Sequence, residues 1–162
     1  MNALQKDLEI AKLLYFSSCK GETALHFAAR SGHAEVATLL LRSGAKWDVR
    51  NSKEETALAY AVGEGHVEVV KILIQNGVDV NAVNEEKKTA LHFAAWRGHV
   101  DVAKVLIQNG ADVNAIDENK YTALHFAART GHVDVAKVLI QNGADVNAPQ
   151  KDDWTPLHYA GR

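Results

Sequence analysis

The chain of 162 residues is 47% hydrophobic and 23% charged, which is the ordinary composition of one folded domain. Its 18 lysines and arginines stand against 20 acidic residues, a formal net charge of −2, so the chain has no overall positive field that would favour nucleic acid or anionic lipid. Cys19 is the only cysteine, which excludes an internal disulfide and a multi-cysteine zinc site and predicts a cytoplasmic location, with the nucleus as the alternative.

Residues 1–17 predict an amphipathic helix that covers one end of the fold. Apolar residues recur there at helical spacing, at Leu4, Leu8, Ala11 and Tyr15. Charged residues stand mostly between them, so the segment has neither the apolar core of a secretory signal nor the length of a membrane span. We therefore expect no membrane association.

Five related strings then follow one another at a constant period of 33 residues. They read TALHFAA, TALAYAV, TALHFAA, TALHFAA and TPLHYAG, and they begin at Thr23, Thr56, Thr89, Thr122 and Thr155. The first four are each followed by a Gly-His pair, an apolar run such as VDVAKVLI, and NGADVNA or a related string. This order at this period resembles the ankyrin repeat. The resemblance covers residues 18–162, divided into repeats 18–50, 51–83, 84–116 and 117–149 and an incomplete fifth repeat, 150–162.

The residues of each repeat predict two short helices and a turn. The threonine can cap a first helix of roughly two turns, because its hydroxyl accepts a hydrogen bond from a free amide, and the following glycine can end the helix. A second helix, from His132 to Gln141 in the fourth repeat, carries apolar residues on more than one face and must pack on both sides. After Gly143 a polar stretch turns back as a hairpin-like finger. We expect an all-α ankyrin repeat solenoid.

The eight histidines occupy only two positions of the repeat, which argues against a metal site. The first position, after Thr-x-Leu, holds His26, His92, His125 and His158, with Ala59 in the second repeat, and the other, after the glycine, holds His33, His66, His99 and His132. The resemblance implies that the first set is structural and bonds the threonine and nearby backbone. Equivalent residues of stacked repeats lie about 10 Å apart, which is too far for shared metal bonds of about 2 Å. We expect no metal and no cofactor.

No other residues support a catalytic site. Cys19 lies beside Lys20, but no group that could activate it as a nucleophile can be identified. The glycines stand singly at helix ends rather than in a phosphate-binding loop. Asp79, Asp112 and Asp145 recur at one framework position, so they are interpreted as scaffold. We therefore expect no enzymatic activity.

The third and fourth repeats show where specificity lies, because they agree at 27 of 33 positions. The six differences are Asn84/Asp117, Glu86/Asn119, Lys88/Tyr121, Trp96/Arg129, Arg97/Thr130 and Ile116/Pro149. Most of them fall in the finger or at the end of the first helix, which line the concave face of the ankyrin fold. Positions that vary within a repeated scaffold are free for partner contacts.

These positions give a candidate partner-binding set across the chain. Its members are Glu22, Arg30, Glu55, Glu64, Lys88, Trp96, Arg97, Tyr121, Arg129, Thr130 and Trp154. The early half is mainly acidic, whereas the later half combines aromatic and cationic side chains of the kinds enriched at interface hot spots. We expect the later half to bind an acidic, partly apolar segment of a partner protein. In the alternative, Trp96 and Trp154 pack between repeats and the arginines only solubilise them.

Some repeats depart from the family pattern. Glycine, which the family often has two residues before the threonine, occurs here only as Gly21, and we expect finger tips that are either strained or turned differently at Glu54, Lys87, Lys120 and Asp153. Residues 51–66, in which Ala59 replaces the histidine that follows Thr-x-Leu, should be the weakest part of the stack. The resemblance also suggests that Asn81, Asn114 and Asn147 match asparagines that an oxygen-dependent hydroxylase modifies in some ankyrin proteins.

The sequence as a whole predicts a protein-binding module. The alternatives are a structural spacer or targeting array inside a larger protein and an engineered repeat scaffold without a natural partner. The fifth repeat stops after its first helix, so either the chain is a fragment of a longer array or this end pairs with another molecule. We expect a monomer, with self-association through the fifth repeat as the alternative.

Overall fold

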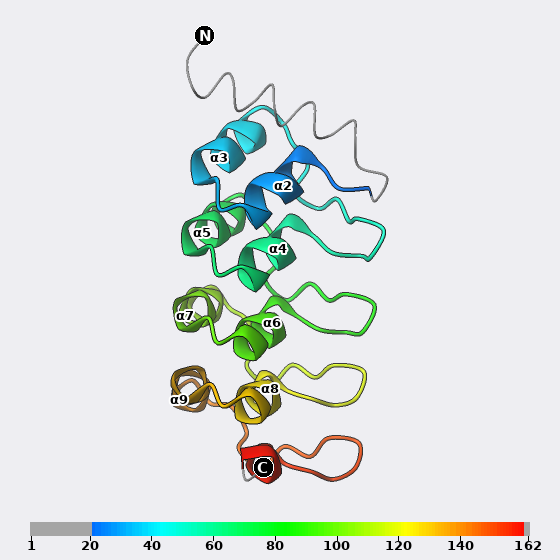
Figure 1. Ribbon diagram of the computed structural model, residues 1–162, viewed down its shortest axis with the longest axis vertical. Coiled ribbons are helices and arrows are strands. Elements are labelled where there is room, and N and C mark those ends of the chain that lie inside the picture. The colour runs from blue at the N-terminus through cyan, green and yellow to red at the C-terminus, as the bar shows by residue number, and fades with distance from the viewer. Residues whose placement is uncertain (1–20, 161–162) are drawn as a thin grey trace. The chain divides into compact units, whose positions relative to one another are not determined.

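The computed structural model describes residues 21–160, and these residues form helices and turns without a strand (Figure 1). The predicted helix over residues 1–17 and Cys19 lie outside the described residues. The chain divides between Asp79 and Val80 into two compact units, here called the N-terminal and C-terminal units. Each of them is described by itself.

The N-terminal unit contains two pairs of helices. The first pair is α2 (Ala24–Arg30) with α3 (Ala34–Arg42), and the second is α4 (Ala57–Gly63) with α5 (Val67–Gln75). The first helices α2 and α4 pack side by side, as do the second helices α3 and α5, so the unit has two layers. The loop between the pairs extends from the layer of first helices as a finger (Figure 1).

The C-terminal unit continues the same pattern. Its helices are α6 (Ala90–Arg97), α7 (Val100–Gln108), α8 (Ala123–Thr130), α9 (Val133–Gln141) and α10 (Pro156–Ala160). The first helices α6, α8 and α10 form one layer, and α7 packs beside α9 in the other. The predicted all-α ankyrin solenoid is confirmed by this repeated stacking of helix pairs within each unit.

The core of each unit lies between its two layers. The leucine of each Thr-x-Leu string is at most 4% exposed in the first four repeats, at Leu25, Leu58, Leu91 and Leu124. Small residues such as Ala94 and Ala95 are fully buried, which lets first helices approach closely. From the second helices, Leu106 and Leu139 are also fully buried. Burial of these apolar groups is the main source of stability for helices that are too short to persist alone.

The threonine caps form as predicted and include the histidine. At Thr89, the backbone N–H donates to Nδ1 of His92 at 3.0 Å, and the threonine hydroxyl lies 2.9 Å from the same nitrogen. The other ring nitrogen, Nε2, lies 3.0 Å from the carbonyl oxygen of Tyr121 in the next repeat. Since Nδ1 accepts a hydrogen bond, the proton stands on Nε2, which donates. The structural role of this histidine is confirmed.

Equivalent bonds join the histidines of the first and fourth repeats to the next finger. His26 lies 3.1 Å from the carbonyl oxygen of Glu55, and His125 lies 3.2 Å from that of Trp154. The second repeat has Ala59 instead, so the hydroxyl of Thr56 accepts only the backbone N–H of Ala59, at 3.3 Å.

Of the two alternatives expected for the finger tips, the structure shows strain. Glu54, Lys87, Lys120 and Asp153 have φ angles of 59°, 58°, 62° and 60°, in the left-handed region. Gly21, at the equivalent position of the first repeat, has φ 69°. A side chain at such a position costs roughly 1–2 kcal/mol relative to ordinary helical backbone.

Candidate partner-binding surface

In the N-terminal unit, predicted contact residues bind one another. Glu22 is only 8% exposed, and its Oε1 accepts hydrogen bonds from the guanidinium of Arg30 and, at 2.6 Å, from the hydroxyl of Tyr60. The Arg30 guanidinium carbon lies 4.2 Å from the centre of the Tyr60 ring. Glu22 was predicted as a contact residue, but the structure places its carboxylate inside the chain.

Glu22, Arg30 and Tyr60 form a cluster, here called the Glu22 cluster. The same contacts explain the pKa values of Glu22 and Tyr60. Burial raises the pKa of Glu22, but the hydrogen bonds from Tyr60 and Arg30 outweigh it, and the net pKa lies below its usual value of 4.5. Burial and the bond to Glu22 raise the pKa of Tyr60 to about 12. Glu22 therefore remains a carboxylate and Tyr60 a donor at neutral pH.

The finger of the second repeat belongs to this cluster through Asn51. Its Oδ1 accepts the backbone N–H groups of Lys53 and Glu55 at 2.8 and 3.0 Å, which shapes the finger. Its Nδ2 donates to the Tyr60 hydroxyl at 3.0 Å and to the Glu55 carboxylate at 3.3 Å. Glu55 is half-buried there, whereas Glu64, the C-cap of α4, is exposed.

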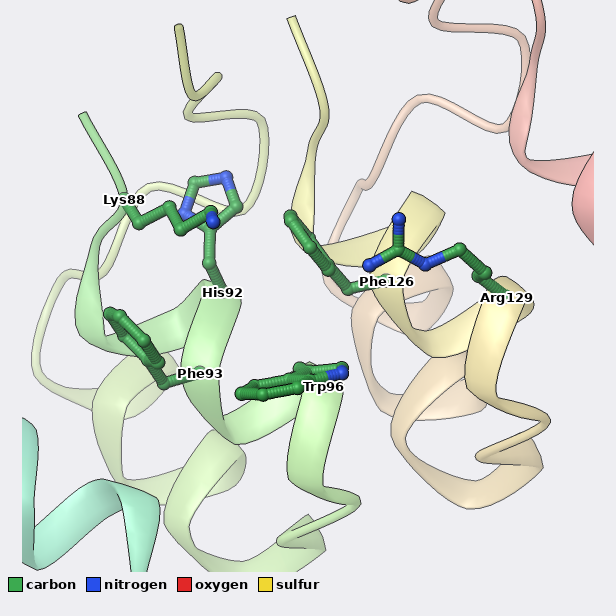
Figure 2. A pocket seen from close by; sticks show the side chains of 6 residues that line it. All are labelled: Lys88, His92, Phe93, Trp96, Phe126 and Arg129. Atoms are coloured by element: carbon green, nitrogen blue, oxygen red, sulfur yellow. The ribbon is translucent and has the colours of Figure 1, made fainter. Parts of the chain in front are cut away.

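In the C-terminal unit, helices α6 and α8 and the finger before α6 enclose a small pocket (Figure 2). Its volume is about 100 Å³, and its lining consists of Lys88, His92, Phe93, Trp96, Phe126 and Arg129. Trp96 is 44% exposed although it is a large aromatic residue. The pocket thus brings together the predicted contact residues Lys88, Trp96 and Arg129 with two phenylalanines that were not predicted.

The pocket carries two cations around one aromatic ring. The Lys88 Nζ lies 5.6 Å and the Arg129 guanidinium carbon 5.1 Å from the centre of the Phe126 ring, which is the range of cation–π contacts. Lys88 also pairs with Glu86 at 2.5 Å, and Glu86 is 53% exposed. Among the described residues, no carboxylate pairs with Arg129. The pocket is therefore positively charged although the whole chain has a net charge of −2.

A second set of aromatic residues surrounds the last finger. The hydroxyl groups of Tyr121 and Tyr159 lie 2.8 Å apart, and the rings of Trp154 and Tyr159 lie 5.3 Å apart. This hydrogen bond and burial raise the pKa of Tyr121 to about 12. The Arg129 guanidinium carbon lies 5.7 Å from the Tyr121 ring centre. The structure therefore groups Tyr121 with both Arg129 and Tyr159.

The remaining predicted contact residues differ in exposure. Arg97 is exposed, and its guanidinium carbon lies 5.0 Å from the Trp96 ring centre. Thr130 is half-buried, and its hydroxyl donates to the carbonyl oxygen of Phe126 at 2.7 Å within its own helix. Trp96, Arg97 and Arg129 are therefore the most accessible members of the set in the C-terminal unit.

One pair of repeat positions recurs in three contacts and was not recognised in the sequence. The residue before the threonine contacts the aromatic residue of the next first helix, in the pairs Glu22–Tyr60, Lys88–Phe126 and Tyr121–Tyr159. The signal was present, since the fourth residue after each threonine is aromatic, at Phe27, Tyr60, Phe93, Phe126 and Tyr159. Because phenylalanine occupies this position in both the third and fourth repeats, it resembles a scaffold position in the sequence.

The asparagines of the DVN strings join neighbouring turns. In the C-terminal unit, Asn81 Nδ2 donates to the carbonyl oxygen of Gly110 at 2.9 Å, and its Oδ1 accepts the N–H of Asp112 at 2.8 Å. Asn114 makes the same two bonds, to Gly143 and Asp145, at 3.0 and 2.8 Å. These amides hold the stack together, and their hydroxylation stays a hypothesis.

Neither a metal centre nor a membrane span is found in the described part of the chain. Among residues 21–160, no group of three or more His, Cys, Asp or Glu side chains is placed to hold a metal ion. None of the described helices has the length and apolar character needed to cross a membrane.

Three family models match the chain in overlapping or adjoining segments. The model described as "Ankyrin repeat" matches residues 20–52, "Ankyrin repeats (3 copies)" matches residues 40–117, and "Ankyrin repeats (many copies)" matches residues 106–160. No curated protein matches the chain. The matches agree with the period of the sequence and with the helix pairs of both units. The chain therefore belongs to the ankyrin repeat family.

Proposed function

We propose that this protein binds an acidic, partly apolar segment of a partner protein through the fingers and first helices of its C-terminal unit. Ankyrin repeats are in general protein–protein interaction modules and are typically not enzymes. The observation that carries the finer proposal is the pocket beside Trp96, where exposed aromatic surface adjoins Arg129. Partially exposed aromatic and arginine side chains are the residues that most often dominate binding energy at interfaces.

The N-terminal unit has a supporting role in this proposal. Of its three predicted acidic contact residues, Glu22 is satisfied by Arg30 and Tyr60, whereas Glu64 is exposed and Glu55 is half-buried. Accessible carboxylates of this unit would repel an acidic segment that bound here instead of in the C-terminal unit. We also propose a cytoplasmic or nuclear location, which the single cysteine supports, and a monomeric state.

The alternative of a repeat scaffold without a natural partner rests on the close match between two repeats. They agree at 27 of 33 positions, as an array built from one consensus would. The differences are concentrated around the finger and the end of the first helix, which favours selection for binding over simple repetition. A structural spacer would be expected to tolerate loss of Trp96 and Arg129.

Affinity capture with paired variants tests the proposal. One variant carries Trp96→Ala, Arg97→Ala and Arg129→Ala, all exposed residues of first helices. Its matched control carries Lys104→Ala, Val133→Ala and Lys137→Ala, exposed residues of the second helices. All three proteins must first show equal melting temperatures, because a folding defect would also abolish capture.

The expected result is a protein that the parent chain and the control variant capture but the first variant does not. Capture of the same proteins by all three chains, or by none, would contradict binding through this face and favour the spacer or scaffold alternative. A protein lost only from the control would assign binding to the second helices instead.

A further inference from the structure

Three positions of the repeat are joined by a carboxylate in the N-terminal unit but have no acidic residue at the pocket of the C-terminal unit. In the N-terminal unit, Glu22 supplies a carboxylate to Arg30 of its own repeat and to Tyr60 of the next. In the C-terminal unit the corresponding residues are Lys88, Trp96 and Phe126 at the pocket and Tyr121, Arg129 and Tyr159 one repeat later, and none of them is acidic. The carboxylate that the N-terminal unit provides internally has no counterpart in the pocket.

We propose that the pocket formed by Lys88, Trp96, Phe126 and Arg129 receives a single glutamate side chain of the partner segment. The proposal rests on the proposed function and names the group that is recognised. The occupant's carboxylate lies between Lys88 and Arg129, and its methylene groups lie against Trp96 and Phe126. The partner's carboxylate would bind cations in this pocket as the Glu22 carboxylate binds Arg30 in the N-terminal unit.

The size of the pocket indicates a side chain rather than a small molecule. Its volume of about 100 Å³ is well below the roughly 300–1,000 Å³ of sites that enclose drug-sized ligands. In Figure 2, Trp96 closes one end of the pocket, whereas the charged ends of Lys88 and Arg129 lie at the level of the Phe126 ring. This division into an apolar end and a cationic end matches a methylene chain that ends in a carboxylate.

The positive charges around the pocket favour a negatively charged occupant. Two cations lie near the Phe126 ring, at 5.6 and 5.1 Å from its centre, and both attract a negatively charged occupant. Glu86 neutralises Lys88 only from an exposed position, and Arg129 pairs with no carboxylate in the described residues. An entering carboxylate gains charge-assisted hydrogen bonds from both cations, which are stronger than bonds between neutral groups. A basic side chain gains neither bond, and the carbonyl oxygen of an amide accepts such bonds without the added attraction between opposite charges.

The proposal is tested by selecting from a display library of random linear peptides with the full chain as bait. Peptides enriched by the parent chain should contain glutamate next to an apolar residue. Replacing that glutamate with glutamine in a synthetic peptide should weaken binding by about tenfold, the loss expected for a hydrogen bond to a charged group. The same replacement should have a much smaller effect on binding to an Arg129→Gln chain, because the partner of the carboxylate is then absent.

Three chain variants complete the test. The variant Lys88→Glu, Trp96→Arg, Phe126→Tyr reproduces the closed cluster of Glu22, Arg30 and Tyr60, so it should fold and fail to enrich the acidic peptides. Arg129→Glu should select basic residues in place of glutamate. Lys137→Glu, which makes the same change of charge on α9, should select the parent's peptides.

The outcomes separate this proposal from the proposed function. Enriched peptides that lack an acidic residue, but are lost on Trp96→Ala, would overturn the glutamate proposal and leave partner binding by this face intact. Identical peptides from the parent and the closed variant would overturn the pocket as the binding site. A library that yields no enriched peptide would also overturn the glutamate proposal, whereas the capture experiment tests the proposed function on its own.

Discussion

Glu22 and Lys88 occupy the same position of their repeats, yet they lie in opposite electrostatic surroundings. Glu22 is buried against Arg30 and Tyr60, whereas Lys88 lies at the open pocket beside Phe126. Position within the repeat therefore determines which neighbours a side chain meets. The identity of those neighbours determines whether it binds inside the chain or remains available to a partner.

The backbone strain at the finger tips can be tested by a substitution at Lys120. Its φ is 62° and its side chain is exposed, so Lys120→Gly removes a cost of roughly 1–2 kcal/mol while adding about 0.5–1 kcal/mol of chain entropy in the unfolded state. We expect the free energy of unfolding to rise by about 0.5–1 kcal/mol in urea titrations. Glu118→Gly, on the same finger but without a positive φ, is the control and should lower stability. An equal loss in both variants would contradict the assignment of strain.

The second repeat differs from the others in the N-terminal cap of its first helix and in the hydrogen bonds that this cap makes. Thr56 has only the backbone N–H of Ala59 as a capping partner, whereas Thr89 and Thr122 are each bonded by a histidine that also reaches the next finger. The helix α4 thus lacks the histidine bonds that cap the N-terminal ends of α6 and α8. The N-terminal end of α4 should therefore open more often than those of α6 and α8.

Native-state hydrogen exchange tests this difference between elements. We expect the amides of residues 51–66 to exchange faster than the matching amides of residues 84–99 and 117–132, because fewer bonds must break to expose them. The two later segments serve as internal controls because they share the period and most of the sequence. Slower exchange in residues 51–66 than in both controls would show that the missing histidine does not weaken this repeat.

The helices, their caps and the strained tips could be predicted from the sequence because each depends on residues close together in one repeat. Thr89, His92 and Lys87 act through local backbone geometry that the period repeats. The candidate site could be predicted only in outline. Whether Glu22 is available depends on Tyr60, 38 residues away, and on the conformation of Arg30, and neither follows from a repeat pattern. The phenylalanines of the pocket were not predicted, because a residue that is the same in both repeats can belong either to the core or to a binding site.

At the scale of the molecule, three buried histidines link stability to pH. Burial lowers the pKa values of His26, His92 and His125 below 6.5, although hydrogen bonds to backbone carbonyls oppose the shift. The unfolded chain then binds protons first as the pH falls, so stability is fully present above about pH 6.5 and is lost as the pH falls toward the lower folded-state pKa values. Glu22, whose pKa is also lowered, adds a further loss below about pH 4.5.

Urea titrations between about pH 7.5 and pH 5 measure this dependence. The urea midpoint should fall as the pH decreases. In a His92→Gln variant the midpoint should be lower at the start and should fall less steeply, because one of the three titrating groups is gone. A midpoint that stays constant or rises toward pH 5 would contradict neutral, buried histidines.

We propose that the fingers and first helices of the C-terminal unit hold a partner protein. Hydrogen exchange of the full chain, with and without a protein recovered by the capture experiment, tests it most directly. We expect slower exchange on binding in residues 84–97 and 117–130, with little change in Val100–Gln108 and Val133–Gln141. Protection confined to those two second helices would contradict binding through the fingers and first helices, because it would place the partner on the opposite layer of the unit.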